Sequence, residues 1–275
     1  MYSDAAIIRK YRLPRDTIRQ LIDSLGPQLQ RPTGCTFALT PTVQVLAALR
    51  FYATGSFMEV VGDGLGLSKA SVSRAVTAVT PLLLQHVQSI TFPTTAEDIM
   101  QANQAFHAIG QLPRVIGAID VTLIPVASPS EDEPMYICRK GYPAINVQVT
   151  CNARGLFTNV VAKWPGSTHD SFFWTNSGLH ELAEDGWFGD SWLLGDSGFP
   201  LRPYLLTPVL QPTTPAEQRY NAAHASTRSI VERAIGVWKQ RFQRFLKRFL
   251  QLKPEKCCSV IVATALRAGQ YTCAR

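Results

Sequence analysis

The 275-residue sequence has no long hydrophobic run and few cysteines. No apolar stretch reaches the roughly 18 residues that a membrane-crossing helix needs. The basic residues near the N-terminus are not followed by an apolar segment, so a secretory signal is not expected there. The six cysteines form no C-x-x-C pair, which argues against a zinc site and against a secreted disulfide scaffold. We therefore expect a protein of a reducing compartment that makes no membrane contact.

Charged residues are also sparse. They make up 17% of the chain, against 46% hydrophobic residues, which is the composition of an ordinary globular protein. The net charge is nevertheless +7. The segment 228–256 holds nine basic and two acidic residues, a difference of +7, so it accounts for the whole excess. A basic stripe of this kind attracts a phosphate backbone, although a solvated helix face would show the same pattern.

Apolar residues at helical spacing run through residues 1–112 and predict an all-α N-terminal region. Residues of about 40–80 contain a short helix, a glycine turn and a helix capped by Ser68, the outline of a helix-turn-helix. Lys69 and Arg74 face outward near the start of that last helix, where a recognition helix contacts DNA. We therefore predict that both bind DNA, although a helical hairpin that only packs would have the same outline.

Capping and breaking residues predict where helices begin and end. Gly26-Pro27 is expected to end the first clear helix, which begins at Pro14. Thr40 is an expected N-cap with proline at the next position, and Gly55 is expected to stop that helix.

Residues 113–275 change to a β-rich texture and predict a second domain. Strands are expected over 115–126, 145–151, 156–163 and 191–194, and helices over 170–184 and from 215 to about 249. The order β-β-β-α-β-α is the ribonuclease-H arrangement, in which the first strand pairs with the fourth in parallel. The predicted fold class is therefore α/β: a ribonuclease-H-like catalytic domain, with a mixed sheet flanked by helices, preceded by an all-α region with a helix-turn-helix.

Three carboxylates fall at positions of this fold where chemistry is expected. Asp120 lies inside the first strand among apolar neighbours, where a charge is costly unless it is paired or bound to a metal. Asp196 ends the fourth strand, and Glu232 lies on the long helix beside apolar residues. Ligands of open α/β sheets bind beyond the carboxyl ends of strands. Each residue alone could be structural, but together they suit Mg²⁺, which prefers oxygen ligands and can act in pairs on phosphodiesters.

The basic segment also contains an alternation of aromatic and arginine residues. Phe242, Phe245, Leu246 and Phe249 form an expected apolar stripe on one helix face. The neighbouring face is expected to offer three arginines to phosphates: Arg241, Arg244 and Arg248.

Several longer motifs resemble those of PIF/Harbinger-class DDE transposases and the vertebrate nucleases derived from them. They cover nearly the whole chain and include residues 139–142, 164–171, 195–201, 204–208 and 220–224. The resemblance implies a ribonuclease-H-like domain, a divalent metal such as Mg²⁺ or Mn²⁺, and a DNA substrate. It places the catalytic, metal-binding carboxylates at Asp120, Asp196 and Glu232, with Asp170 as a rival for the second position. Arg139 and Lys140, in one of these motifs, are expected to bind DNA.

The resemblance also bears on partners and location. Relatives act with a separate Myb-like DNA-binding protein that helps nuclear entry, so we expect such a partner and a nuclear location, with some of the protein in the cytoplasm. A homo-oligomer is an open alternative to a monomer. The expected activity is a metal-dependent DNA endonuclease that cuts by a two-metal DDE mechanism. The alternative is a domesticated DNA-binding or scaffold protein that keeps the carboxylates but does not transpose.

Overall fold

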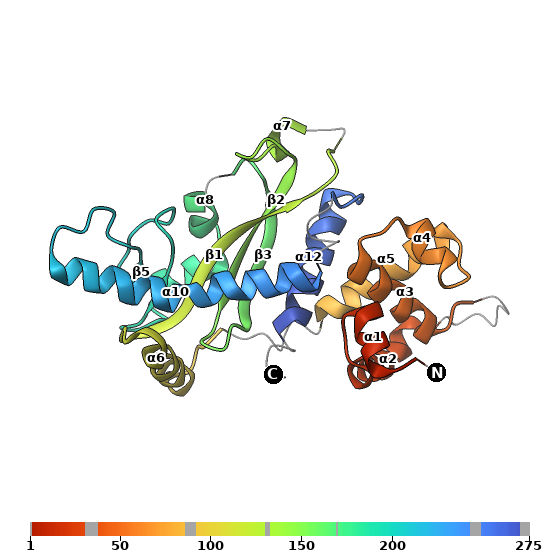
Figure 1. Ribbon diagram of the computed structural model, residues 1–275, viewed down its shortest axis with the longest axis horizontal. Helices are drawn as coiled ribbons and strands as arrows, with labels where there is room; N and C mark the ends of the chain where they lie inside the picture. Colours follow the sequence, from red (N-terminus) through yellow and green to blue (C-terminus); the bar gives the residue numbers. More distant parts are fainter. Residues whose placement is uncertain are drawn as a thin grey trace. The chain divides into compact units, whose positions relative to one another are not determined.

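The computed structural model describes residues 2–30, 38–85, 92–129, 133–168, 170–242 and 249–269. The chain divides into two compact units (Figure 1). The first comprises residues 1–88, 125–127 and 239–264, and the second comprises residues 89–124, 128–238 and 265–275. No described helix has both the length and the apolar character that crossing a bilayer requires.

The first unit is helical. Its elements are α1 (Asp4–Tyr11), α2 (Arg15–Leu29), α3 (Pro41–Thr54), α4 (Met58–Asp63), α5 (Lys69–Gln85) and most of α12 (Pro254–Gly269). Helix α3 begins as predicted, because the Thr40 hydroxyl accepts a hydrogen bond from the backbone N–H of Val43 at 3.4 Å. It also ends as predicted at Gly55, whose positive φ of 55° favours glycine.

The predicted end of α2 at Gly26-Pro27 is wrong. The helix continues to Leu29, with Pro27 inside its last turn. A proline there removes one hydrogen bond from the helix. Leu29 is buried, so packing holds the last turn in helical form despite that loss.

Helices α4 and α5 follow the predicted short helix, turn and capped helix. The Ser68 hydroxyl accepts a hydrogen bond from the backbone N–H of Ser71 at 3.2 Å, which satisfies an otherwise orphaned donor at the start of α5. Valines at positions 72, 76 and 79 are buried, while Lys69 and Arg74 are exposed. The predicted inward and outward faces of α5 are therefore confirmed.

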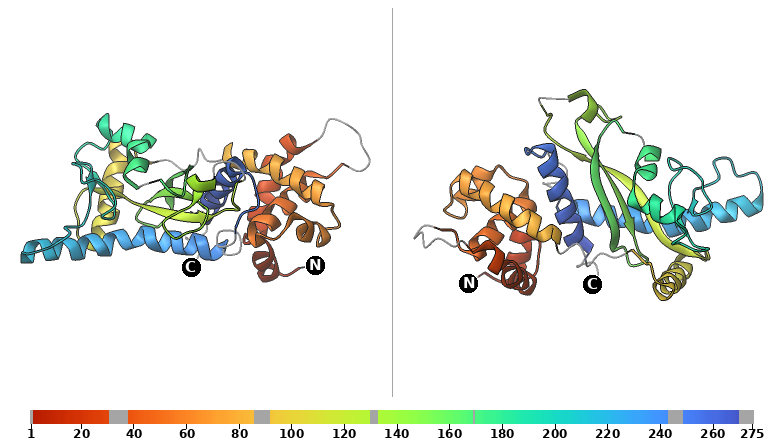
Figure 2. Two further views of the ribbon diagram at one scale, coloured as in Figure 1. Left: turned by 90° about the horizontal axis from the view of Figure 1, so that it is seen from above. Right: turned by 180° about the vertical axis from the view of Figure 1, so that it is seen from behind.

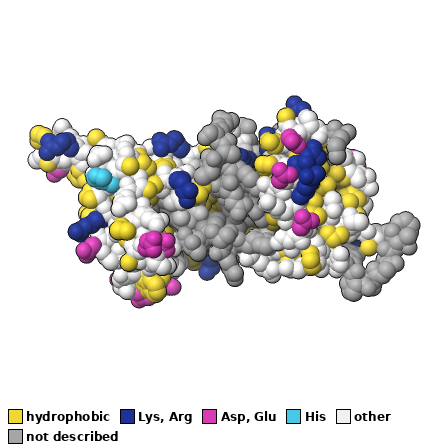
Figure 3. All heavy atoms as spheres, turned by 90° about the horizontal axis from the view of Figure 1, so that it is seen from below, with side chains coloured by type: hydrophobic (Ala, Val, Ile, Leu, Met, Phe, Trp, Pro, Cys, Tyr) yellow, Lys and Arg dark blue, Asp and Glu magenta, His cyan; other side chains and the backbone are white. Residues whose placement is uncertain are grey.

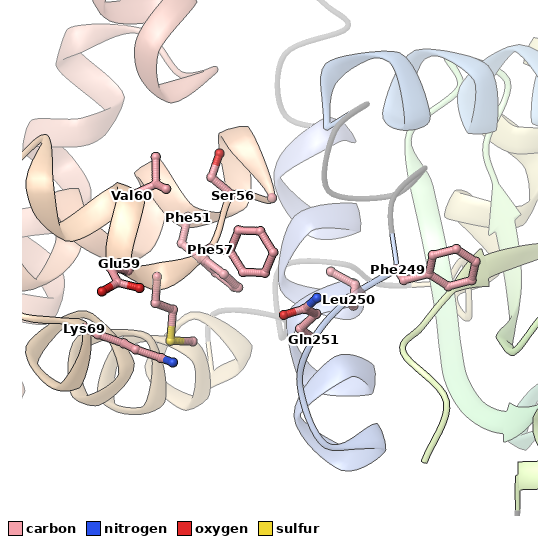
Figure 4. Close-up of a pocket in the computed structure, with 11 residues that line it drawn as sticks. Phe51, Ser56, Phe57, Glu59, Val60, Lys69, Phe249, Leu250 and Gln251 are labelled. Atoms are coloured by element: carbon pink, nitrogen blue, oxygen red, sulfur yellow. The ribbon is translucent and has the colours of Figure 1, made fainter. Parts of the chain in front are cut away.

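A cavity of about 630 Å³ lies within the first unit (Figure 4). Its lining combines Phe51, residues 55–60 and Lys69 with the segment 249–251. Phe57 and Phe249 are both more than half exposed, so the cavity opens as an apolar surface. The predicted DNA-binding residue Lys69 lies on the same side of it as Glu59 (Figure 4).

The second unit is built on a five-stranded sheet of order β3-β2-β1-β4-β5. The strands are β1 (Val115–Pro125), β2 (Ala144–Cys151), β3 (Phe157–Pro165), β4 (Trp192–Leu194) and β5 (Leu205–Leu206). Strands β2 and β3 form the predicted antiparallel hairpin. Strand β1 pairs with β4 in parallel, also as predicted, and β4 pairs with β5 in parallel. The predicted ribonuclease-H-like α/β class is confirmed.

Helices cover both faces of this sheet (Figure 2). On one face Ile119 and Leu193 join a core with Trp174 from α8 (Asp170–Thr175) and Leu179 from α9 (Gly178–Glu184). On the other face lies α10 (Pro215–Arg241), whose Ala234 comes close to the β2–β3 turn at Gly155. The alternation of side chains along β1 therefore sends Ile119 to one helical layer and Asp120 to the other.

The helix predicted over 170–184 is two helices. Ser177 separates them, because its hydroxyl donates to the Trp174 carbonyl at 2.8 Å and accepts from the His180 N–H at 3.2 Å. Serine competes with the helical backbone in this way, so α8 ends and α9 begins with Ser177 as its N-cap. Strand β5 and the short helix α7 (Glu133–Tyr136) were not predicted.

Helix α6 (Ala96–Gly110) belongs to the second unit. Ile99 and Ala102 pack against the core of the sheet, so α6 is one of the helices that flank the sheet. The two compact units differ in extent from the predicted domains 1–112 and 113–275. That domain boundary stays a prediction.

Candidate catalytic site

Asp120 and Asp196 follow equivalent positions on neighbouring parallel strands. Ala118 of β1 is paired with Leu194 of β4, and each aspartate comes two residues later along its strand direction. Asp120 still lies within β1, whereas Asp196 lies in the loop that leaves β4. The Gly198 N–H donates to Asp196 Oδ1 at 3.0 Å and orders this loop. The two carboxylates therefore share one end of the sheet, where α/β proteins bind ligands.

Asp120 is in an environment that disfavours its negative charge. Burial is the main cause and raises its pKa from 3.8 to about 6. The charges of Asp196 and Glu232 raise the pKa further, while the Val121 N–H, 2.9 Å from Oδ1, and the nearby Arg228 lower it. All three predicted carboxylates therefore interact electrostatically in one region, although they come from a strand, a loop and a helix.

Arg228 connects two of these carboxylates. Its Nη1 lies 3.7 Å from Asp120 Oδ2, and its Nη2 donates to Glu232 Oε1 one helical turn later. The Arg228 and Asp120 side chains are each 18% exposed, whereas that of Glu232 is 52% exposed. Glu232 therefore lies on the open side of the site. Its neighbour Arg233 instead donates to the Ser229 hydroxyl at 2.8 Å.

The start of α10 fixes this helix to the loop after β5. The Asn221 side chain accepts from the Val209 N–H at 2.9 Å and donates to the Val209 carbonyl at 2.8 Å. Tyr220 donates to the Thr207 carbonyl at 2.9 Å. The buried His224 lies 3.3 Å from the Leu206 carbonyl, and burial lowers its pKa. Two of the recognised motifs, 204–208 and 220–224, therefore contact each other and place α10 against the end of the sheet.

The donor chemistry of the site fits a divalent cation. Its carboxylate oxygens are the ligands that Mg²⁺ prefers, and the burial of Asp120 disfavours its negative charge unless a cation balances it. In the arrangement seen here, however, no group of three or more His, Cys, Asp or Glu side chains among the described residues could hold a metal ion. Arg228 supplies positive charge to Asp120 and Glu232 instead.

The rival aspartate, Asp170, begins helix α8. Its side chain lies outside the described part of the chain, so the choice between Asp170 and Asp196 stays a prediction. What the structure does show is that Asp196 contributes to the electrostatic environment of Asp120.

The predicted DNA-binding residues are distributed over both units. Arg139 and Lys140 are exposed at the tip of a turn, in which the Gly141 N–H donates to the Cys138 carbonyl at 2.8 Å. Lys69 and Arg74 are exposed on α5. On the face drawn in Figure 3, the Lys and Arg side chains form separate patches rather than one continuous stripe. DNA contact by these residues stays a prediction.

The predicted basic helix is only partly described. Helix α10 ends at Arg241, and Arg244, Arg248, Phe245 and Leu246 lie outside the described residues. Phe242 is buried as predicted, but Phe249 is not helical and is 53% exposed. The expectation that one helix carries the apolar stripe as far as Phe249 is therefore wrong. Arg241 is partly buried rather than fully offered to solvent.

Arg228 is a site residue that sequence reasoning counted only as part of the basic excess. The sequence nevertheless contains a pattern that points to Arg228. Every fourth residue from 220 to 232 is aromatic, titratable or both: Tyr220, His224, Arg228 and Glu232. Residues four apart lie on one face of a helix. The face that carries Tyr220 and His224 therefore leads directly to Arg228 and Glu232.

Comparison with known proteins agrees with this fold. The family model described as "DDE superfamily endonuclease" matches residues 119–266, which include all three carboxylates. "Putative nuclease HARBI1" of Rattus norvegicus is 40% identical over 264 residues, which are 95% of this chain and 76% of that protein. The Xenopus laevis protein of the same name is 35% identical over 267 residues, 96% of this chain and 77% of that one. "Protein ALP1-like" of Arabidopsis thaliana is 28% identical over 220 residues, 73% of this chain and 53% of that one.

The ribonuclease-H-like sheet with its converging carboxylates defines the class of this protein as a DDE superfamily endonuclease. Such enzymes generally use divalent metals and act on DNA. Within this class, the chain belongs to the PIF/Harbinger family, together with the transposase-derived nucleases that it resembles over most of its length.

Proposed function

We propose that this chain is a metal-dependent DNA endonuclease in which Asp120, Asp196 and Glu232 hold Mg²⁺ or Mn²⁺ and support a two-metal mechanism. The observation that carries the proposal is the electrostatic convergence of these carboxylates at one end of the sheet. When bound, two such ions activate a water molecule and stabilise the leaving oxygen of a phosphodiester.

The protein's own groups prepare this site in different ways. The Val121 N–H engages one oxygen of Asp120, which leaves the other directed at a cation. The turn at Gly198 holds Asp196 in place. Glu232 is half exposed, so it stands where a DNA backbone can approach. The strand and the ordered loop would thus hold the metal ligands in place, while the exposed helix residue would leave room for the substrate.

The test is a plasmid-nicking assay with Mg²⁺ or Mn²⁺, and with EDTA as the blank. Wild type should nick the supercoiled plasmid, and Asp120→Asn should not. Asp190→Asn is the matched control, because Asp190 is an 89% exposed aspartate of the same unit. Far-UV circular dichroism should show the same fold in all three proteins. If wild type binds DNA but cuts it with neither metal, the alternative of a domesticated DNA-binding or scaffold protein is supported instead.

We also propose a Myb-like DNA-binding partner and a nuclear location, on the strength of the family resemblance. Co-purification of the full chain with a Myb-like protein would support the partner, and sedimentation of the pure chain would decide between a monomer and a homo-oligomer. Microscopy of the tagged chain expressed alone and with the partner would test the location.

A further inference from the structure

Arg228 is placed where the site needs a cation. Its guanidinium reaches Asp120 from one side and Glu232 from the other, and the Arg228 and Asp120 side chains are largely buried. Among the described residues, the ion pairs of both carboxylates are made with Arg228. A guanidinium presents several donors in a planar fork and does not lose its proton in proteins. It can therefore bridge two carboxylates at any pH at which they are ionised.

The bridge uses the same atoms that a metal would need. Asp120 Oδ1 accepts the Val121 N–H at 2.9 Å, and Oδ2 faces Arg228 Nη1 at 3.7 Å. Glu232 Oε1 is likewise the acceptor of the Arg228 guanidinium. Arg228 therefore lies against one oxygen of Asp120 and one oxygen of Glu232.

We propose that Arg228 is an internal counter-cation that pairs with Asp120 and Glu232 in the metal-free protein and must leave them when a divalent ion binds. The inference rests on the proposed function, since it presumes that these carboxylates are metal ligands. It adds that the Arg228 guanidinium balances the charges of Asp120 and Glu232. Loss of one partner of a largely buried pair is costly, so this pairing should stabilise the protein until metal replaces the guanidinium.

Competition of this kind has a measurable consequence. The apparent affinity for a ligand is the intrinsic affinity multiplied by the fraction of molecules in the state that can bind the ligand. If the arginine-paired state holds about nine molecules in ten, its removal should tighten metal binding by roughly tenfold. An arginine that helped to assemble the ligands would have the opposite effect on metal binding.

The experiment measures binding of Mn²⁺ alone to the full chain by titration calorimetry, with wild type, Arg228→Ala, Arg228→Lys and Arg233→Ala. Arg233→Ala is the matched control. It removes the same charge from the same helix, but the Arg233 side chain donates to the Ser229 hydroxyl. We expect Arg228→Ala to bind Mn²⁺ about tenfold more tightly, Arg228→Lys to fall between it and wild type, and Arg233→Ala to stay within about twofold of wild type. If Arg228→Ala does not fold, Arg228→Gln, which keeps more of the side-chain volume, takes its place.

Thermal melts give a second readout that general charge effects would not reproduce. In EDTA, Arg228→Ala should melt below wild type. With saturating Mn²⁺ the two should melt together, because the arginine no longer contributes. An Arg228→Ala protein whose Mn²⁺ affinity is unchanged or weaker overturns the inference. The proposed function still stands in that case if wild type binds Mn²⁺ and Asp120→Asn does not. If wild type itself binds no Mn²⁺, both proposals fail.

Discussion

Asp120 and Asp196 lie at matching places on two neighbouring parallel strands. Ala118 of β1 is paired with Leu194 of β4, and each aspartate comes two residues after its paired residue. This relationship brings together two side chains that are 76 positions apart in sequence, and it makes the charge of Asp196 part of the environment of Asp120. Glu232 completes the group from helix α10.

The second catalytic aspartate can be identified by substitution. Asp196→Asn should lower plasmid nicking by more than the roughly 100-fold that loss of a group supporting a metal ligand can cost. Glu232→Gln should do the same, and neither change should weaken DNA binding measured by fluorescence anisotropy. Asp170→Asn should keep more of the activity. An inactive Asp170→Asn beside an active Asp196→Asn would show that the second aspartate has been chosen wrongly.

Asp120 should make the metal-free protein less stable at neutral pH. Its pKa is raised from 3.8 to about 6 in the folded state, so the folded protein binds the proton more tightly than the unfolded chain. The stabilising contribution of protonation is fully present below about pH 4 and is lost as the pH rises through about 6. The difference amounts to about 3 kcal/mol at most, at about 1.4 kcal/mol per pKa unit.

The measurement is urea unfolding of wild type and Asp120→Asn in EDTA between about pH 4 and about pH 7. The stability of wild type relative to Asp120→Asn should fall across this range, because asparagine does not titrate there. A relative stability that rises with pH would mean that the pairing of Asp120 with Arg228 outweighs the cost of burying its charge.

Gly110 should be essential to the packing of α6 against α10. A Cβ atom at Gly110 would lie 2.1 Å from Thr227 Oγ1 and 2.8 Å from the Ala223 carbonyl, so α10 would have to move. Gly110→Ala should therefore lower the free energy of unfolding by about 1–3 kcal/mol, the usual effect of overpacking. Because Thr227 precedes Arg228, the same change should also disturb the site.

Gly236→Ala is the matched control for this prediction. Gly236 lies inside α10 near its C-terminal end, and nothing stands within 4 Å of an added Cβ. Alanine there should raise the free energy of unfolding by up to about 1 kcal/mol, because glycine is a poor helix former. Both values come from the same urea titrations, and equal effects of the two substitutions would contradict the close approach of α6 and α10.

Helix α5 should contribute to duplex binding. Lys69→Ala with Arg74→Ala should weaken affinity and reduce the slope of log affinity against log salt by up to about 1.8, at about 0.9 for each phosphate contact. Arg19→Ala is the control, since Arg19 is 64% exposed on α2 of the same unit. An unchanged slope in the double variant would leave α4 and α5 as a packing unit and would pass DNA recognition to a partner protein.

The basic segment after α10 is predicted to follow the phosphate backbone. Changing Arg241, Arg244 and Arg248 together to Ala should reduce the salt slope by roughly one to three. Arg241 is partly buried, so it should account for the smallest part of the change. If the slope equals that of wild type while nuclear import is lost, the segment acts as an import signal and not as a DNA contact.

Local features of this protein could be predicted from its sequence because short-range physics decides them. The cap at Thr40, the stop at Gly55 and the cap at Ser68 depend on side chains and backbone groups a few residues apart. The strand and hairpin positions followed from apolar runs and turn residues, and the order of these elements pointed to the parallel pairing of β1 and β4. The choice of Asp120, Asp196 and Glu232 as metal ligands stays a prediction.

Long-range relationships were decided only in the folded chain. Helix α2 continues beyond Pro27 because its last turn is packed against the rest of the unit. Side-chain hydrogen bonds of Ser177 divide the helix predicted over 170–184 into two. The raised pKa of Asp120 depends on how deeply one residue of β1 is buried. The role of Arg228 depends on how α10 is held against the end of the sheet, since only that placement brings its guanidinium to a strand carboxylate 108 positions earlier. Burial and Coulomb interaction depend on distance in space, which a linear pattern does not contain.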